Sequence, residues 1–120
     1  MASDLPLFLL WEKLTLDLLD RTALMPKAMR FTFAQRIDNL AIDVLERIAA
    51  ARFARGPRKS ILLAEIDETI ARLRIVVRLC HTRRLLSGGA YELIMAQLEE
   101  AGKMIGGWRK GADRGETSTD

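Results

Sequence analysis

The stretch YELIMAQLEEAGKMIGGW, residues 91–108, decides the fold of this chain. Its apolar residues recur at intervals of three and four, which is the period of an α-helix with one buried face. These residues are Tyr91, Ile94, Leu98, Ala101, Ile105 and Trp108. We therefore expect a helix here, with Ser87 as its cap next to the break at Gly88-Gly89. Glycines at 102, 106 and 107 predict either a closely packed neighbour or an early end of this helix.

A first helix is expected near the N-terminus. Asp4 is suited to cap it, Pro6 falls in its first turn, and Pro26 disfavours its continuation. Its expected core residues are Leu7, Leu10, Leu14 and Leu18. The apolar run from residue 5 to residue 11 exceeds one buried stripe, so this helix is either central or contacts another subunit through its second face.

Two more helices are expected between these. One follows Pro26 and extends to about Phe53, before the Gly56-Pro57 break, and the other runs from about Arg58 to Leu86. The expected core of the former is Phe33, Ile37, Leu40, Val44, Ile48 and Ala51, and that of the latter is Leu62, Ile66, Ile70, Leu73, Val77 and Cys80.

The whole pattern predicts an all-α protein, an antiparallel up-down-up-down four-helix bundle, because the connections between the helices are short. With 120 residues, of which 49% are hydrophobic, one domain over residues 1–110 accounts for the chain. The polar residues 111–120 are expected to form a disordered tail.

The expected location is the cytoplasm, without membrane insertion. The longest apolar run near the N-terminus, Leu7–Trp11, is far shorter than the roughly 20 residues that a membrane span needs. Asp4 precedes this run where a secretory signal would carry basic residues. The single cysteine, Cys80, falls on an expected core position and is interpreted as structural.

The residues that catalysis would require are missing from the pattern. A di-iron bundle needs inward carboxylates and two Glu-x-x-His pairs, whereas His81 is the one histidine of the chain. Neither Cys80 nor Ser87 has an evident base, and no glycine-rich phosphate loop follows a strand. We therefore expect a protein that is not an enzyme and that has no metal, no cofactor and no small-molecule substrate.

Positive charge is concentrated in the middle of the chain. Residues 52–84 carry nine Lys or Arg against three acids, a net +6, which leaves −3 for the rest of a chain whose total is +3. Such clustering favours binding of a polyanion, and solvation of exposed helix faces is the alternative. The candidate residues for contact with nucleic acid or a polymerase are Arg36, Arg55, Arg58, Lys59, Arg72, Arg74, Arg78, Arg83 and Arg84.

Three segments together resemble the Avd family, the accessory variability proteins of bacterial diversity-generating retroelements. They read MPKAMRFTFAQRI at 25–37, RLRIVVRL at 72–79 and GKMIGGWRK at 102–110. The similarity extends from about Leu5 to Lys110. The residues that match the family motifs are Pro26, Lys27, Arg30, Phe31, Gly106, Gly107 and Trp108.

This resemblance implies a four-helix protomer that assembles into a positively charged homopentamer. It also implies a reverse transcriptase as partner, together with RNA or cDNA, and a role in mutagenic reverse transcription that diversifies a target gene. The proteins encoded in ribosomal RNA intervening sequences share a similar Pro-x-x-x-Arg-Phe element, so a helical assembly protein without a nucleic-acid role is the alternative. The Gly-Gly-Trp element favours Avd.

Overall fold

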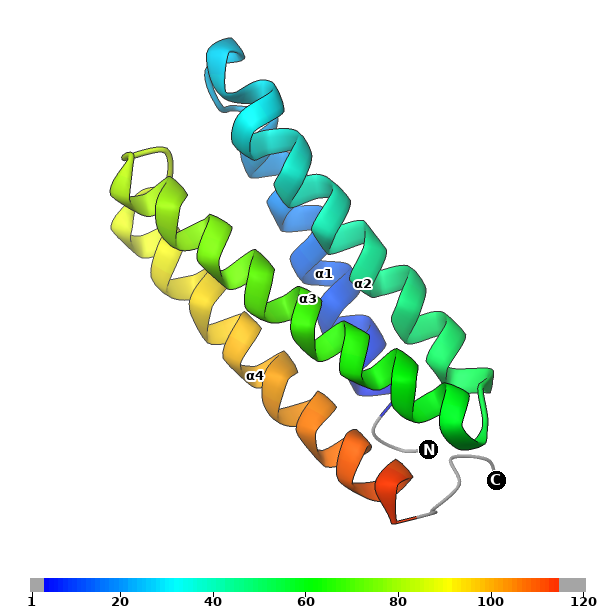
Figure 1. The fold of residues 1–120 in the computed structure, drawn as a ribbon. Coiled ribbons are helices and arrows are strands. Elements are labelled where there is room, and N and C mark those ends of the chain that lie inside the picture. Colours follow the sequence, from blue (N-terminus) through cyan, green and yellow to red (C-terminus); the bar gives the residue numbers. More distant parts are fainter. Residues whose placement is uncertain (1–3, 115–120) are drawn as a thin grey trace.

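A computed structural model describes residues 4–114 of the chain and contains four long helices (Figure 1). They are α1 (Asp4–Thr22), α2 (Gln35–Phe53), α3 (Gly56–Thr82) and α4 (Gly88–Asp113). Within the described residues there is no strand, so the predicted all-α class with four helices is confirmed. The fourth helix continues three residues beyond the expected boundary at 110, and residues 115–120 of the expected disordered tail lie outside the described part.

The connections alternate between the two ends of an elongated molecule (Figure 1). The α1–α2 connection, residues 23–34, and the α3–α4 connection, residues 83–87, lie at the end that we call the connection end. The α2–α3 turn, residues 54–55, lies at the opposite end of a molecule that extends 46 Å along its long axis, and we call this the turn end. Each helix packs closely on its neighbour in the chain, and α1 packs more lightly on α4.

The core confirms the helical stripes that the sequence predicts. Of the expected core residues, only Leu10, Phe33 and Tyr91 are partly buried, and the others are buried. The most important addition is Trp11, which is fully buried and whose Nε1 donates a 2.8 Å hydrogen bond to the Ala41 carbonyl of α2. This hydrogen bond links the middle parts of α1 and α2.

Of the two predicted N-terminal capping residues, one caps its helix and the other does not. Ser87 caps α4 as predicted, because its hydroxyl accepts a 3.1 Å hydrogen bond from the Ala90 amide. The predicted cap at Asp4 is wrong: its buried carboxylate accepts no hydrogen bond from the described residues. Instead it forms an ion pair with Arg52 of α2, with 3.3 Å between Oδ2 and Nε.

A break in the helical pattern separates Pro26 from α2. A 3₁₀ turn, η1 (Lys27–Met29), leads into a π-helical turn, η2 (Arg30–Ala34), and only then does α2 begin. The sequence predicted one continuous helix here, and the periodicity alone does not reveal the wider turn. This turn leaves Phe31 with 77% of its surface exposed.

The glycines of α4 do not end the helix, so the early-end interpretation is wrong. A Cβ added at Gly106 or Gly107 would meet nothing within 4 Å, and one at Gly102 would lie 4.0 Å from the Arg74 guanidinium. Close packing on another helix is therefore not seen at these glycines within the described protomer.

The second face of α1 is open. Leu5, Leu9 and Leu16 follow the helical repeat on the side away from the core, and each exposes about half of its surface. The helix is thus not enclosed by the other three. Among residues 4–114, none of the helices combines the length and the apolar character that a membrane span requires.

Candidate nucleic-acid interface

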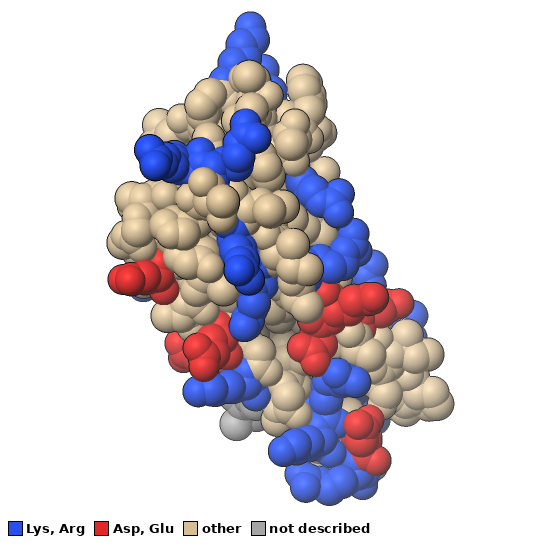
Figure 2. Space-filling view, turned by 60° about the vertical axis from the view of Figure 1, so that its left-hand side comes forward, with Lys and Arg blue, Asp and Glu red and all other residues tan. Residues whose placement is uncertain are grey.

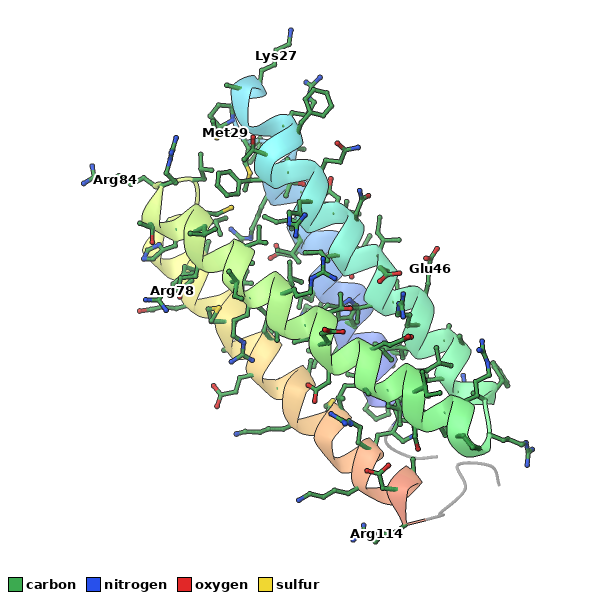
Figure 3. All side chains as sticks on the ribbon, viewed as in Figure 1. Lys27, Met29, Glu46, Arg78, Arg84 and Arg114 are labelled. Atoms are coloured by element: carbon green, nitrogen blue, oxygen red, sulfur yellow. The ribbon has the colours of Figure 1, made fainter. Side chains whose placement is uncertain are left out.

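Two segments without any carboxylate lie at the connection end. Residues 21–37 contain four Lys or Arg and no acid, and residues 69–91 contain five Arg and no acid. The first segment surrounds the α1–α2 connection and the second surrounds the α3–α4 connection, so the fold brings them to the same end (Figure 1). Lys27, Arg78 and Arg84 mark this region in Figure 3. In Figure 2 the upper part of the visible face shows basic residues without acidic ones.

Six of the predicted arginines belong to this half of the molecule and form no ion pair with a described residue. Five are exposed, and Arg74 is partly buried. These six, the connection-end arginines, are Arg36, Arg72, Arg74, Arg78, Arg83 and Arg84. Because their guanidinium groups have no carboxylate to satisfy them, they are available for phosphate oxygens, which guanidinium groups bind in a bidentate manner.

One row of these arginines follows the border between α2 and α3. Glu65 of α3 forms an ion pair with Arg47 of α2, and this pair identifies the sides of the two helices that face each other. Arg72 lies seven residues after Glu65, and Arg36 lies eleven residues before Arg47. Both separations are close to whole numbers of helical turns, so both arginines lie on this border.

A second row follows the border between α3 and α4. Asp67 of α3 pairs with Arg109 of α4 at 2.7 Å, which identifies the facing flanks. Arg74 and Arg78 lie seven and eleven residues after Asp67, so they share its flank. The helix α3 therefore carries arginines on both sides of its outer surface.

An apolar strip lies between the two rows. Ile75 and Leu79 of α3 are 61% and 49% exposed. Exposed apolar residues bordered by arginines are typical of protein contacts, in which Arg is enriched and the centre excludes water. The candidate surface is therefore mixed: it can offer cations to phosphate and an apolar strip to a protein.

The remaining predicted residues do not belong to this surface. Arg55 and Arg58 are exposed at the turn end. Arg58, in the first turn of α3, precedes Arg83, which directly follows the helix, by 25 residues, a separation of about 37 Å at about 1.5 Å per residue. The nine predicted residues therefore do not form one continuous surface in the described protomer, because residues of one basic segment lie at opposite ends of a long helix.

Lys59 is a second correction. Only 6% of its surface is exposed, and its Nζ lies 5.5 Å from the centre of the Trp108 ring, in a cation–π contact between α3 and α4. A lysine in this position stabilises the packing of two helices and is not accessible to a phosphate backbone.

The other chemically active groups are occupied within the bundle. The His81 ring stacks on Tyr91 with 4.2 Å between ring centres, and its Nδ1 lies 3.5 Å from the Leu86 carbonyl. Cys80 is buried, and burial raises the pKa of its thiol from 9.0 to about 11. Among the described residues no group of three or more His, Cys, Asp or Glu is arranged to hold a metal ion.

Comparison with known families agrees with the resemblance seen in the sequence. Residues 10–112 match the family described as bAvd-like. The chain belongs to the bAvd-like family. This is an Avd-type, non-catalytic accessory family. Neither a curated protein nor a solved structure gives a significant match to the chain.

The motifs that carried the resemblance to Avd occupy two separate places in this member of the bAvd-like family. Pro26 and Lys27 lie at the start of the 3₁₀ turn in the α1–α2 connection, and Arg30 and Phe31 begin the π-helical turn. The Gly-Gly-Trp element, residues 106–108, lies in the last third of α4, toward the turn end. Sequence reasoning missed that Arg30 and Phe31 join the basic end. The absence of acids in residues 21–37 was the signal that could have shown it.

Proposed function

We propose that this chain is a non-enzymatic accessory protein of a diversity-generating retroelement, which binds a reverse transcriptase and its template RNA or cDNA through the connection end. In this role it supports mutagenic reverse transcription. The proposal rests on one observation: two acid-free segments lie at one end and hold the connection-end arginines, none of which forms an ion pair with a described residue.

The physical mechanism is electrostatic. Guanidinium groups that approach phosphates release condensed counterions, which gives salt-dependent binding with little sequence preference. The apolar strip at Ile75 and Leu79 is suited to the polymerase, because a protein partner can cover it from water. The accessory protein then holds the RNA close to the polymerase that copies it.

Charge reversal at one arginine row tests the proposal. Arg74→Glu with Arg78→Glu should weaken binding to both RNA and polymerase, while circular dichroism shows unchanged helicity. The matched control is Arg55→Glu with Arg58→Glu, which makes the same change in charge at the turn end and should leave binding nearly unchanged. If the doubly substituted 74/78 protein binds both partners as well as the parent does, this surface is wrongly assigned.

We also propose that the protein acts in the cytoplasm as a homopentamer. The exposed leucines of α1 support self-assembly, because another copy of the chain can cover them. Light scattering at micromolar concentration should give a mass of several 13.5 kDa protomers. Leu9→Lys with Leu16→Lys should reduce this mass, and a parent protein that is already monomeric would contradict the assembly.

The alternative function is a helical assembly protein without a nucleic-acid role, and the apolar strip of α3 is the observation that favours it. Salt titration of the parent protein separates the two functions. Binding driven by phosphate weakens steeply as salt rises, whereas an apolar protein contact is nearly indifferent to it.

A further inference from the structure

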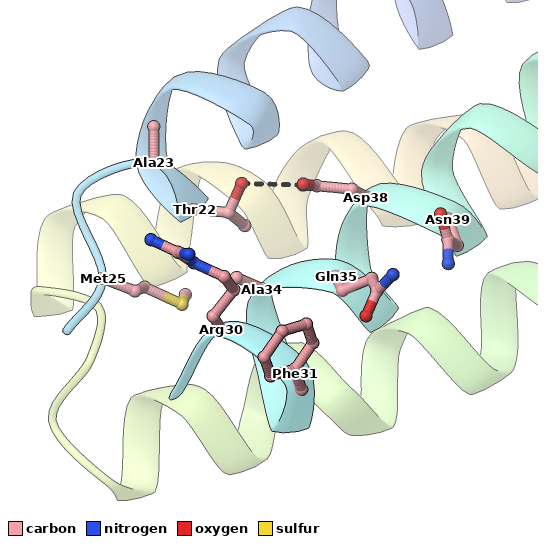
Figure 4. A pocket seen from close by; sticks show the side chains of 9 residues that line it. All are labelled: Thr22, Ala23, Met25, Arg30, Phe31, Ala34, Gln35, Asp38 and Asn39. Carbon is pink, nitrogen blue, oxygen red and sulfur yellow. Dashed lines mark hydrogen bonds between the residues drawn. The ribbon is translucent and has the colours of Figure 1, made fainter. Parts of the chain in front are cut away.

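Phe31 is an exposed aromatic residue between two open grooves. Figure 4 shows the first groove, which has a volume of about 400 Å³ and is lined by residues that include Arg30, Asp38 and Asn39. The second groove, of about 320 Å³, includes Arg36 and Leu40. Phe31, Gln35 and Asn39 line both grooves, so the ring stands on the ridge that separates them.

The Phe31 ring has little structural role in the described protomer. A phenylalanine that stabilises a bundle is buried, whereas 77% of Phe31 is exposed. The π-helical turn is what places it on the surface, and single π-turns inside or beside α-helices occur frequently at functional sites. A flat, exposed ring among cations is suited to a partner that is itself flat and anionic.

The two grooves differ in the charged residues that line them. In the first groove the Asp38 carboxylate accepts a 2.7 Å hydrogen bond from the Thr22 hydroxyl, and the lining contains one acidic and one basic residue, Asp38 and Arg30. The second groove contains Arg36 and no acid. A phosphate is therefore favoured in the second groove. The Gln35 and Asn39 amides, which line both grooves, offer donors and acceptors to the edge of a base.

We propose that Phe31 is a stacking platform for one base of a single-stranded nucleic acid, with Arg36 contacting the adjoining phosphate and the Gln35 and Asn39 amides contacting the base edge. This inference rests on the proposed function and adds a contact to the base where that function requires contacts only to phosphate. Single-stranded nucleic acid is favoured over a protein partner because the second groove beside the exposed ring contains Arg36 and no acid, and because the ring lies at the basic end of the molecule.

The test compares two probes: a fluorescently labelled single-stranded RNA oligonucleotide, and an abasic ribose-phosphate oligomer of the same length. Phe31→Ala should weaken binding of the RNA between about fivefold and 150-fold, the range expected for loss of one stacked base. Binding of the abasic oligomer should be unchanged, because it engages the arginines alone. Phe31→Trp should retain the affinity for RNA.

The chain offers a matched control and a spectroscopic readout. Phe53 is 79% exposed but lies at the turn end, where the Arg52 guanidinium carbon is 5.7 Å from its ring centre, so Phe53→Ala should change neither affinity. The native residues Trp11 and Trp108 are buried. In Phe31→Trp the new exposed indole should therefore be quenched by the RNA and not by the abasic oligomer.

Each other outcome overturns the inference. If Phe31→Ala binds the RNA as the parent does, or loses both probes equally, no base stacks on this ring. A changed mass in light scattering, or loss of polymerase binding with RNA binding intact, would place Phe31 in a protein contact instead. If the parent itself binds neither probe, the proposed function fails and this inference fails with it.

Discussion

Removing two arginines from the connection end should change how steeply RNA binding depends on salt. The change is Arg83→Gln with Arg84→Gln, which removes charge without introducing an acid. Both residues are exposed and form no ion pair with a described residue, so the bundle should keep its stability. The matched control is Arg55→Gln with Arg58→Gln at the turn end.

The magnitude follows from the number of available guanidinium groups. If each of the six connection-end arginines contacts one phosphate, a plot of log affinity against log salt has a slope of about −4 for a single strand. Between about 50 and 200 mM salt the parent then loses about 300-fold in affinity. With two contacts removed the slope becomes about −3 and the loss about 50-fold.

Fluorescence anisotropy with one labelled single-stranded RNA, repeated over this range of salt, measures the slopes directly. The parent and the 55/58 control should share one slope, and the 83/84 variant should have a shallower one. Equal slopes for all three proteins would show that Arg83 and Arg84, at the connection end, make no contact with phosphate. A shallower slope in the 55/58 variant alone would move the interface to the turn end.

Three other predictions concern the bundle itself. Trp11→Phe removes the donor to the Ala41 carbonyl and leaves a small cavity, so urea unfolding should show a loss of about 2 kcal/mol, and a loss below about 0.5 kcal/mol would contradict the buried indole bond. Gly107→Ala, where a Cβ meets nothing, should raise the free energy of unfolding by about 1 kcal/mol, whereas Gly56→Ala should lower it by a similar amount because φ is +59° there. The opposite order of these two variants would refute the local conformations. Burial raises the pKa of the Cys80 thiol to about 11, so ionisation is easier in the unfolded chain. The parent should therefore lose stability relative to Cys80→Ala as pH rises from 9 to 11, as measured by urea unfolding at each pH, and parallel pH profiles would contradict this.

Helical periodicity predicted most of the fold because burial of one face leaves a direct mark on the spacing of apolar residues. The stripe from Tyr91 to Trp108 and the seam from Leu62 to Cys80 both lie in the core. Periodicity failed where the backbone departs from 3.6 residues per turn, as at Arg30–Ala34, because a π-turn shifts the face on which each side chain lies. It also missed the pairing of Asp4 with Arg52, which depends on how two helices are placed relative to each other.

The candidate site could be predicted only in part, and the difference has a physical cause. The amino-acid sequence by itself determined the family, the helices, the core stripes and the presence of clustered arginines, because these are properties of neighbours along the chain. Only the tertiary structure decided which cations act together. It brought two acid-free segments to one end, separated Arg55 and Arg58 from the others by the length of α3, and buried Lys59 against Trp108. Electrostatic interactions depend on distance in space. Residues of one long helix can lie far apart although they are close in sequence, whereas the connections at one end place residues from distant parts of the sequence in the same region.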